Sequence, residues 1–430
     1  MSYQETIDYL FNALPAYQNQ GKSAYKDNLD NTYALMEALN YPHQHFKSIH
    51  IAGTNGKGSV SHILAAIFQR CGYKTGLYTS PHLLDFRERI RINGAVISEE
   101  AVVNFTRENK ALFEQIKPSF FEMTVALAFH TFREEKVDIA IVETGMGGRL
   151  DSTNVLQPEA SVITNISRDH AQFLGDTLEK IAGEKAGIIK ENTPVIVGES
   201  KPQVLPIFEQ VAEAHKAPLH LAQETLKIVT QKTLPHTSTY TYNQAGKYFS
   251  IESDLQGQYQ AQNIATALTT IAVLDQDKNF KLPRGKVLKA LKQVASLTGL
   301  RGRWEQLQQN PLWIVDTGHN EAGIAFLMQQ IAQLPQQNVW LIYGCVKDKE
   351  LDHIMDLFDK KHHYIFTQSS NPRSMDSQVV YAKGRAKNLH CQHSSSVKEA
   401  IILAQKAAQK NDAVIICGST FVVADALKEF

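Results

Sequence analysis

A glycine-rich stretch near residue 55 has the residue types of a phosphate-binding loop. All seven of its residues are candidate nucleotide ligands: Gly53, Thr54, Asn55, Gly56, Lys57, Gly58 and Ser59. The three glycines let the backbone curl so that successive N–H groups face one anion, and Lys57 adds a mobile positive charge. The stretch differs from the common pattern G-x-x-x-x-G-K-[ST], because its spacing is shorter and Gly58 separates Lys57 from Ser59. A glycine turn that joins a strand to a helix and binds nothing is the alternative.

The flanking residues predict a strand before this loop and a helix after it. A short apolar run begins at Ser48, and Gly72 suits the C-terminus of the helix. Apolar residues recur at helical spacing between these points: Val60, Ile63, Leu64, Ile67 and Phe68. One face of the helix should therefore pack on a sheet, while its positive N-terminal end points at the phosphates.

Three more polar residues stand at the ends of predicted strands. Ser80 follows a strand over 74–79, Glu143 ends an apolar strand over 137–142, and His170 follows a third strand. Such strand ends line the ligand crevice of open α/β sheets. Ser80 and Glu143 could therefore hold a nucleotide-bound Mg²⁺, and a neutral His170 imidazole could bind a second divalent metal. The alternatives are a solvent-exposed serine and a partly buried histidine.

Composition indicates a cytoplasmic protein with small-molecule partners. The 430 residues are too many for one ordinary core, and 44 basic residues balance 44 acidic ones, so charge gives no case for nucleic acid or an anionic membrane. Four cysteines stand far apart without a C-x-x-C pair, which fits a reducing compartment and core thiols. The N-terminus lacks a basic start, and no run of about 18 apolar residues occurs. We expect a monomer.

A hairpin and a helix are predicted in the middle of the chain. Two alternating runs within 237–255, separated by Gly246, are typical of an antiparallel hairpin at the edge of the sheet. The following stretch, GQYQAQNIATALTTIAVL, predicts a helix with Asn263 in its first turns. Its predicted buried residues are Ile264, Leu268, Ile271 and Ala272.

The last third of the chain predicts a second domain. From Leu312 the apolar strands LWIVDTG, VWLIYG, HYIFTQ and AVIICG alternate with amphipathic segments, a βα repeat that implies a mostly parallel sheet. Asp316 to Asn320 again places polar groups just past a strand end. We therefore predict an α/β fold with a P-loop nucleotide-binding domain at 1–297, built on a mostly parallel sheet, and a smaller Rossmann-like α/β domain at 298–430.

Eight sequence blocks, taken together, resemble folylpolyglutamate synthase. That family belongs with the Mur ligases, and in many bacteria the enzyme also acts as dihydrofolate synthase. In chain order the blocks are GTNGKGS at Gly53, TSPHL at Thr79, ETGMGGRLDSTN at Glu143, the pair Asp169-His170, EKAGIIK at Glu184, QNIATAL at Gln262, GRWE at Gly302 and DTGHN at Asp316. They run in the family's order along nearly the whole chain.

The resemblance implies ATP-driven amide bond formation through an acyl phosphate. A substrate carboxylate attacks the γ-phosphoryl group of ATP, and the α-amine of L-glutamate then displaces phosphate. The implied carboxylate substrate is dihydropteroate or a reduced folate, and the implied cofactors are two Mg²⁺ ions. Three alternatives stay open: a folylpolyglutamate synthase without the dihydrofolate synthase activity, a Mur-type amino-acid ligase, and a P-loop switch that only hydrolyses nucleotide. A Mur ligase would ordinarily have a further N-terminal domain.

The resemblance also implies roles for individual residues. Ser80 and Glu143 would hold the first Mg²⁺, and Glu143 and His170 the second. Lys185, which by itself reads as a solvated helix lysine, would be carbamylated by CO₂ and so become an anion near the second metal. Asp151 would lie close to the pterin and the reacting groups. The further residues implied to contact ATP are Asn263, Arg301 or Arg303, Asp316 and His319.

Two departures from the family's pattern concern the arginines. The family usually has D-G-A-H-N where this chain has DTGHN at Asp316, and a proline commonly stands at the position of Arg301. The sequence therefore leaves open whether Arg301 or Arg303 contacts phosphate.

Overall fold

The computed structural model describes residues 1–13, 28–234, 237–276, 279–347, 349 and 351–430. These residues divide into two compact units. Unit 1 comprises Met1–Asp254 and Tyr259–Leu300, and unit 2 comprises Leu255–Gln258 and Arg301–Phe430. Within the described residues, no helix is both long enough and apolar enough to cross a membrane.

Unit 1 is built on a sheet of eight strands in the order β4-β3-β2-β5-β1-β6-β7-β8. The strands β2, β5, β1, β6, β7 and β8 pair in parallel with their neighbours in this order, and β3 and β4 add an antiparallel edge. The strands are β1 (Lys47–Ala52), β2 (Thr75–Tyr78), β3 (Ile90–Ile92), β4 (Ala95–Val96), β5 (Ile139–Glu143), β6 (Ala160–Ile163), β7 (Val195–Val197) and β8 (Leu219–Leu221). This confirms the predicted mostly parallel sheet.

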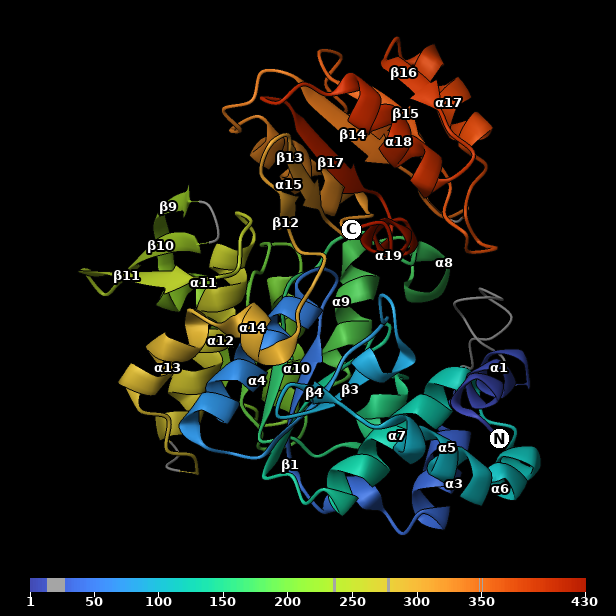
Figure 1. Cartoon of the computed structure of the whole chain (residues 1–430). Coiled ribbons are helices and arrows are strands. Elements are labelled where there is room, and N and C mark those ends of the chain that lie inside the picture. The colour runs from blue at the N-terminus through green and yellow to red at the C-terminus, as the bar shows by residue number, and fades with distance from the viewer. Residues whose placement is uncertain (14–27, 235–236, 277–278, 348, 350) are drawn as a thin grey trace. The chain divides into compact units, whose positions relative to one another are not determined.

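Helices cover this sheet and carry site residues at their ends (Figure 1). The α-helices are α1 (Tyr3–Ala13), α3 (Asp30–Ala38), α4 (Lys57–Cys71), α5 (Glu99–Glu108), α6 (Lys110–Ile116), α7 (Phe120–Glu134), α8 (Ala171–Leu174), α9 (Leu178–Ala186), α10 (Leu205–Ala214), α11 (Ala222–Thr225), α12 (Gln260–Gln276), α13 (Arg284–Leu291) and α14 (Val294–Thr298). Short 3₁₀ helices are η2 (Pro42–Gln44), η3 (Phe86–Arg89) and η4 (Ser152–Val155).

The loop helix α4 packs one face on the sheet, as predicted, and its other faces are buried as well. Every residue from Ser59 to Phe68 is buried. One side of α4 packs on β1, β2 and β5, while α12, α13 and α14 pack against it from elsewhere (Figure 1). Because the covering helices come from a distant part of the chain, the apolar spacing around Ile63 could not reveal them. The predicted C-terminus is confirmed, since Gly72 caps α4 at φ 103°.

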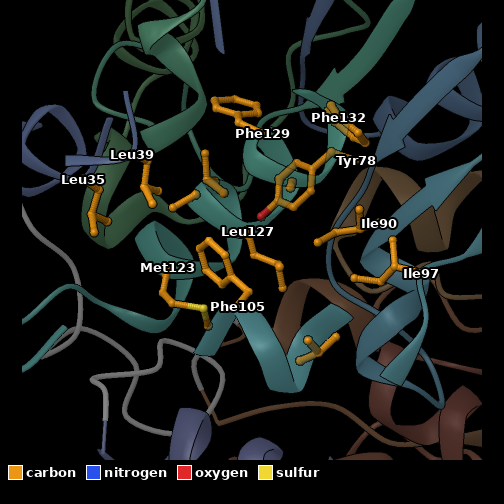
Figure 2. Packing of buried hydrophobic residues seen from close by; sticks show 14 of the residues in the cluster. Leu35, Leu39, Tyr78, Ile90, Ile97, Phe105, Met123, Leu127, Phe129 and Phe132 are labelled. Carbon is orange, nitrogen blue, oxygen red and sulfur yellow. The ribbon is translucent and has the colours of Figure 1, made fainter. Parts of the chain in front are cut away.

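A large apolar cluster fills the space between α7 and the β2 side of the sheet. Figure 2 shows the Tyr78 ring of β2 among Leu127 and Phe129 of α7 and Ile90 of β3. The N-terminus of α7 has a capping box, in which the Ser119 hydroxyl accepts from the amide of Glu122 and the Glu122 carboxylate accepts from the amide of Ser119. The cluster includes Tyr78, the last residue of β2, and so packs against the strand end that precedes Ser80.

Two predictions for the middle of the chain need correction. The predicted hairpin is present, but β10 (Thr237–Gln244) and β11 (Lys247–Ser253) join β9 (Lys227–Leu234) in a separate three-stranded sheet and do not extend the main sheet. The helix α12 is present, but Leu268 is half-buried and Ala272 is exposed. Their side of α12 is less covered than the side that packs on α4.

Unit 2 has a six-stranded sheet in the order β12-β13-β17-β14-β15-β16. All neighbours are parallel except β12, which pairs antiparallel with β13. The strands are β12 (Glu305–Gln308), β13 (Leu312–Val315), β14 (Val339–Tyr343), β15 (His363–Phe366), β16 (His390–His393) and β17 (Ala413–Cys417). The helices are α15 (Glu321–Ile331), α16 (Leu351–Met355), α17 (Ser377–Ala386), α18 (Val397–Ala407) and α19 (Thr420–Leu427). The predicted βα repeat is confirmed.

Candidate nucleotide and metal site

The glycine-rich loop follows β1 and is shaped by close packing against its neighbours. Gly53 and Gly56 have φ angles of 148° and 85°, and Gly56 is the N-cap of α4. A Cβ atom at Gly53 would lie 1.9 Å from the Thr164 hydroxyl oxygen, and one at Gly56 would lie 2.3 Å from the Asn263 side-chain oxygen. Both the conformation and the space therefore require glycine at these positions.

The segment after β6 holds the first half of this loop. The amide of Thr54 donates to the Asn165 carbonyl at 2.9 Å, and the amide of Asn55 donates to the Asn165 side-chain oxygen at 3.0 Å. The Thr164 hydroxyl donates to the Asn55 carbonyl at 2.6 Å. Because the amides of Thr54 and Asn55 are already used, the N–H groups at the start of α4 are the ones that remain for an anion.

Lys57 and the start of α12 complete the loop. The Lys57 amine donates to the carbonyls of Gly53 and Thr54 at 3.1 and 3.2 Å, so its charge lies over the loop. The Gln260 side chain donates to the Ser59 hydroxyl at 3.3 Å and accepts from the Asn263 side chain at 2.9 Å. Asn263 is thus beside the loop as the sequence suggested, while Gln260 was missed because a buried glutamine has no distinctive sequence signal.

Ser80 and Glu143 are brought together by the order of the strands. β2 and β5 are neighbours in the sheet, and the Ser80 amide donates to the Glu143 carboxylate at 3.4 Å. Glu143 is 4 % exposed. A hydroxyl and a carboxylate supply the hard oxygen donors that Mg²⁺ prefers, so these two residues fit one such ion together with nucleotide phosphates.

His170 has a different environment, because the carboxylate of the neighbouring Asp169 lies close to both its amide and its imidazole. It has a positive φ of 52°, its amide donates to the Asp169 carboxylate, and its Nε2 lies 4.0 Å from the other Asp169 oxygen. Among the described residues, no group of three or more histidine, cysteine or acidic side chains is arranged to hold a metal. A metal at His170 would therefore need ligands from substrate or water in addition to any protein ligand.

Lys185 is buried in the last turn of α9, not solvated. It is 3 % exposed, and its amine donates to the Gly53 carbonyl at 2.9 Å. Burial, and then the nearby Lys57 cation, lower the pKa of Lys185 to about 7, against the weaker opposing effect of Asp169, Asp151 and Glu184. The cationic form of this amine is therefore disfavoured, which the reading of Lys185 as a solvated lysine did not foresee.

Asp151 belongs to a buried chain of hydrogen bonds. Its carboxylate accepts from the Thr153 hydroxyl at 2.5 Å and from the Met146 amide at 2.9 Å. The Thr153 hydroxyl also lies 2.8 Å from Nε2 of His50, a fully buried residue of β1. Burial raises the pKa of Asp151 in opposition to these hydrogen bonds, and burial lowers the pKa of His50 to about 3. Thr153 and His50 were missed, because their proximity depends on strand pairing.

In unit 2, Asp316 stabilises the turn that carries the arginines. Its two carboxylate oxygens accept from the amides of Trp304 at 2.8 Å and Gly318 at 2.7 Å. Trp304 is buried at a positive φ of 50°, an unfavourable conformation for a bulky residue. Asp316 therefore fixes this turn, and His319 is held nearby through Nδ1, which lies 3.0 Å from the Thr317 carbonyl.

The two candidate arginines have different partners. Arg301 forms an ion pair with Glu305, with its Nε and Nη2 atoms 2.8 and 2.6 Å from one carboxylate oxygen. Arg303 donates to the Thr317 hydroxyl and the Gly302 carbonyl, which are both neutral. The charge of Arg303 is therefore not balanced by these contacts, whereas that of Arg301 is balanced by Glu305.

Comparison with known proteins identifies the family. Residues 51–271 match the Mur ligase middle domain, and residues 302–420 match the Mur ligase, glutamate ligase domain. The dihydrofolate synthase/folylpolyglutamate synthase of Bacillus subtilis (strain 168) is 32 % identical over 95 % of this chain and 96 % of its own length. The chain therefore belongs to the dihydrofolate synthase/folylpolyglutamate synthase family of Mur-type ligases.

Solved structures agree with this assignment. A Mycobacterium tuberculosis folylpolyglutamate synthase complexed with ADP and AMPPCP superposes with a TM-score of 0.87 at 28 % identity, covering 99 % of this chain and 98 % of that one. E. coli FolC in complex with DHPP and ADP gives a TM-score of 0.85 at 26 % identity, covering 100 % and 97 %. As a member of this family, the chain is an ATP-dependent ligase.

Proposed function

We propose that this ligase uses ATP to join L-glutamate to dihydropteroate and to the γ-carboxylate of reduced folates. The proposal is carried by a group of residues at the carboxyl ends of the central strands of unit 1. The group comprises the glycine-rich loop, the Ser80–Glu143 pair and the buried amine of Lys185. The relative from Bacillus subtilis is named for both activities, and the E. coli structure holds DHPP with ADP, which favours the bifunctional enzyme.

The reaction has two steps. A carboxylate oxygen of the folate substrate attacks the γ-phosphorus of ATP, and ADP leaves to give an acyl phosphate. The neutral α-amine of glutamate then attacks the acyl carbon, phosphate leaves, and one proton is released as the amide forms. The N–H groups at the start of α4 and the Lys57 amine bind phosphate oxygens, which lowers the energy of charge that develops on them.

Ser80 and Glu143 are proposed to hold one Mg²⁺, and Glu143 with His170 a second. When bound, Mg²⁺ would neutralise charge on the β- and γ-phosphate oxygens. The buried position of Glu143 and the Ser80 amide that contacts it keep its carboxylate in one orientation. Asp151 is proposed to hold the 145–148 loop near the pterin, since it binds the Met146 amide.

Lys185 is proposed to act as a carbamate. The neutral amine attacks the carbon of CO₂, a C–N bond forms, and one N–H proton passes to solvent, leaving an anion. Its lowered pKa supplies the neutral amine that this step needs, and the Lys57 charge that disfavours a lysine cation would favour a carbamate. The modification would thus replace a repulsive contact by an attractive one.

Within each unit, further residues are proposed to contact ATP. Asn263 lies beside the loop in unit 1. In unit 2 we propose Arg303, not Arg301, as the phosphate ligand, because Arg301 is neutralised by Glu305 while the partners of Arg303 are neutral. Asp316 and His319 support this turn. The proposed roles are ATP binding for residues 1–297 and glutamate ligation for 298–430.

The proposed setting is a cytoplasmic monomer that acts on small molecules. The balanced charge and the four free cysteines agree with this setting.

One assay tests the proposed reaction. Purified protein is incubated with ATP, Mg²⁺ and labelled glutamate, together with either dihydropteroate or tetrahydrofolate. Label should enter product with both acceptors. Label with tetrahydrofolate alone would show a monofunctional folylpolyglutamate synthase. ADP release that needs neither a pterin nor glutamate would contradict the ligase assignment and favour a nucleotide hydrolase.

A further inference from the structure

One buried arginine holds both ends of the turn that carries Ser80. Arg89 ends η3 and is 2 % exposed. Its carbonyl accepts from the amide of Thr79 at 3.0 Å, on one side of Ser80. Its Nε donates to Nδ1 of His82 at 2.8 Å, on the other side. The turn is therefore attached to the same residue just before and just after the serine.

The hydrogen bond to His82 also fixes the state of that imidazole. An arginine side chain carries only donors, so Nδ1 of His82 must present a lone pair and the ring proton must be on Nε2. Of the sequence block TSPHL, only Ser80 has a role in the nucleotide and metal site described above. The contact with Arg89 gives the histidine of this block a role.

The Arg89 charge is not held in place by an ion pair. Among the described residues, no carboxylate lies within 4.0 Å of its guanidinium nitrogens. The neighbouring Glu88 uses its carboxylate for the amides of Leu83 at 2.7 Å, Leu84 at 3.0 Å and Asp85 at 3.0 Å. The guanidinium carbon lies 5.2 Å from the centre of the Phe120 ring, a cation–π contact.

Burying a cation without a paired anion is unfavourable, so the position of Arg89 calls for a compensating role. Burial lowers the pKa of Arg89, and this effect is opposed first by Tyr78 and then by the charges of Glu143 and Glu88. The Ser80 amide donates to the same Glu143 carboxylate at 3.4 Å. Arg89 thus contacts the turn on both sides of Ser80, through its backbone carbonyl at Thr79 and its side chain at His82.

We propose that Arg89 and His82 are positioning residues, which hold the Ser80 hydroxyl beside Glu143 so that both oxygens meet one Mg²⁺. This rests on the metal role proposed above for Ser80 and Glu143. Neither Arg89 nor His82 is assigned as a ligand of this Mg²⁺. Their effect is to fix the serine in advance, so that metal binding does not have to order the turn.

Metal affinity measured without turnover tests this inference. Mn²⁺ is titrated into the full chain with saturating AMPPCP, and bound metal is followed by electron paramagnetic resonance. Arg89→Met should weaken Mn²⁺ binding by about tenfold or more, within the range of supporting residues around metals. Arg89→Lys keeps the charge but loses the planar donor set, and should fall between Arg89→Met and the wild type. Arg91→Met is the matched control.

Arg91 suits this purpose because it is a partly buried arginine of the adjoining strand β3. Its guanidinium donates to the Gly94 carbonyl at 3.0 Å, away from the Ser80 turn. Arg91→Met should leave Mn²⁺ affinity within about twofold of the wild type. If Arg89→Met and Arg91→Met shift Mn²⁺ affinity equally, Arg89 has only a general structural role and the inference is wrong.

Substitutions of His82 give an independent test that does not depend on the folding of Arg89→Met. His82→Asn can place an amide oxygen near the position of Nδ1 and should retain most Mn²⁺ affinity, while His82→Leu removes the acceptor and should resemble Arg89→Met. The double variant Arg89→Met/His82→Leu should be no weaker than Arg89→Met alone, because Arg89→Met already removes the hydrogen bond to His82. Equal Mn²⁺ affinity of His82→Asn and His82→Leu would overturn the inference. Because this experiment needs neither folate nor glutamate, its result is separate from that of the ligation assay.

Discussion

The charged site residues of the two units satisfy their charges in different ways. In unit 1, Lys185 and Asp151 are buried, and their hydrogen bonds go to backbone and hydroxyl groups. In unit 2, Arg301 is more exposed and pairs with Glu305, while both Asp316 oxygens accept backbone amides. Burial in unit 1 shifts the pKa values of Lys185 and Asp151 toward the neutral forms, whereas in unit 2 two backbone amides hold the Asp316 carboxylate in place.

The difference indicates a division of tasks. We infer that unit 1 holds the groups that change charge in the reaction, in agreement with the lowered pKa of its buried Lys185. In unit 2, polar groups stabilise the turn at Trp304, which has a positive φ. The neighbouring Arg303 donates only to neutral groups in these contacts, so they do not balance its charge. Substitutions in unit 1 should therefore affect chemistry and pH dependence, and those in unit 2 should mainly affect nucleotide affinity.

The largest effect is expected at Lys185. Lys185→Ala should lower ligation by about 10³-fold, of the order seen when a transition-state donor is removed, and short carboxylic acids should restore part of the activity. Lys185→Glu should be less impaired than Lys185→Arg, because glutamate restores a negative charge and arginine keeps a positive one. Activity of the arginine variant equal to or above that of the glutamate variant would contradict the carbamate. So would a crystal structure with both metals and an unmodified amine.

Lys57→Ala should fold and lose most nucleotide-dependent turnover. Loss of a charge-assisted phosphate contact in a closed site is expected to cost about 2 to 4 kcal/mol in transition-state binding. Steady-state kcat/KM for ATP measures this loss, and circular dichroism checks the fold. Wild-type kinetics in this variant would remove the phosphate-loop assignment.

Glu143→Ala should change the Mg²⁺ requirement more than the fold. The Mg²⁺ concentration for half-maximal activity should rise by roughly tenfold to a hundredfold, because one of the two proposed oxygen ligands is gone. Titration of Mg²⁺ against activity at saturating ATP measures the shift. An unchanged midpoint and rate would show that Glu143 is not the shared ligand.

A smaller effect should distinguish the two arginines of unit 2. Arg303→Met should raise the KM for ATP by about tenfold, since a hydrogen bond to a charged group contributes roughly 1.5 to 3 kcal/mol. Arg301→Met, the matched control, should stay within about twofold because an exposed ion pair contributes little. The reverse order of the two KM values would assign the phosphate contact to Arg301.

The smallest effect concerns stability and His50. In the folded protein the pKa of His50 is about 3. Below the ordinary histidine pKa, the unfolded chain therefore binds a proton that the folded chain does not. The free energy of unfolding then falls as pH falls. Between pH 6.5 and 5 this loss is about 1 to 2 kcal/mol. His50→Gln keeps a donor toward Thr153 and cannot titrate, so it should lose less stability over that interval. Urea unfolding of both proteins at the two pH values gives the comparison, and equal losses would show that His50 is not the buried titrating group.

The sequence by itself determined the local features of this protein. The glycine-rich loop, the C-terminus of α4 at Gly72 and the βα repeat of unit 2 depend on residue type and short-range spacing, and the structure confirms them. The positions of Ser80 and Glu143 after or at strand ends were also readable, because polar residues interrupt apolar runs there.

Tertiary structure alone decided which of these features meet. The strand order β2-β5-β1-β6 places Ser80, Glu143 and the loop side by side, and no local pattern encodes that order. Lys185 lies in an ordinary helical turn, and its pKa is lowered by burial near Gly53 and then by the Lys57 charge, both of which depend on the tertiary structure. Likewise, α4 is buried all round because α12 to α14 return to it from a distant part of the chain. Spacing along a chain reports the period of one element, whereas burial and pKa depend on neighbours that long-range packing supplies.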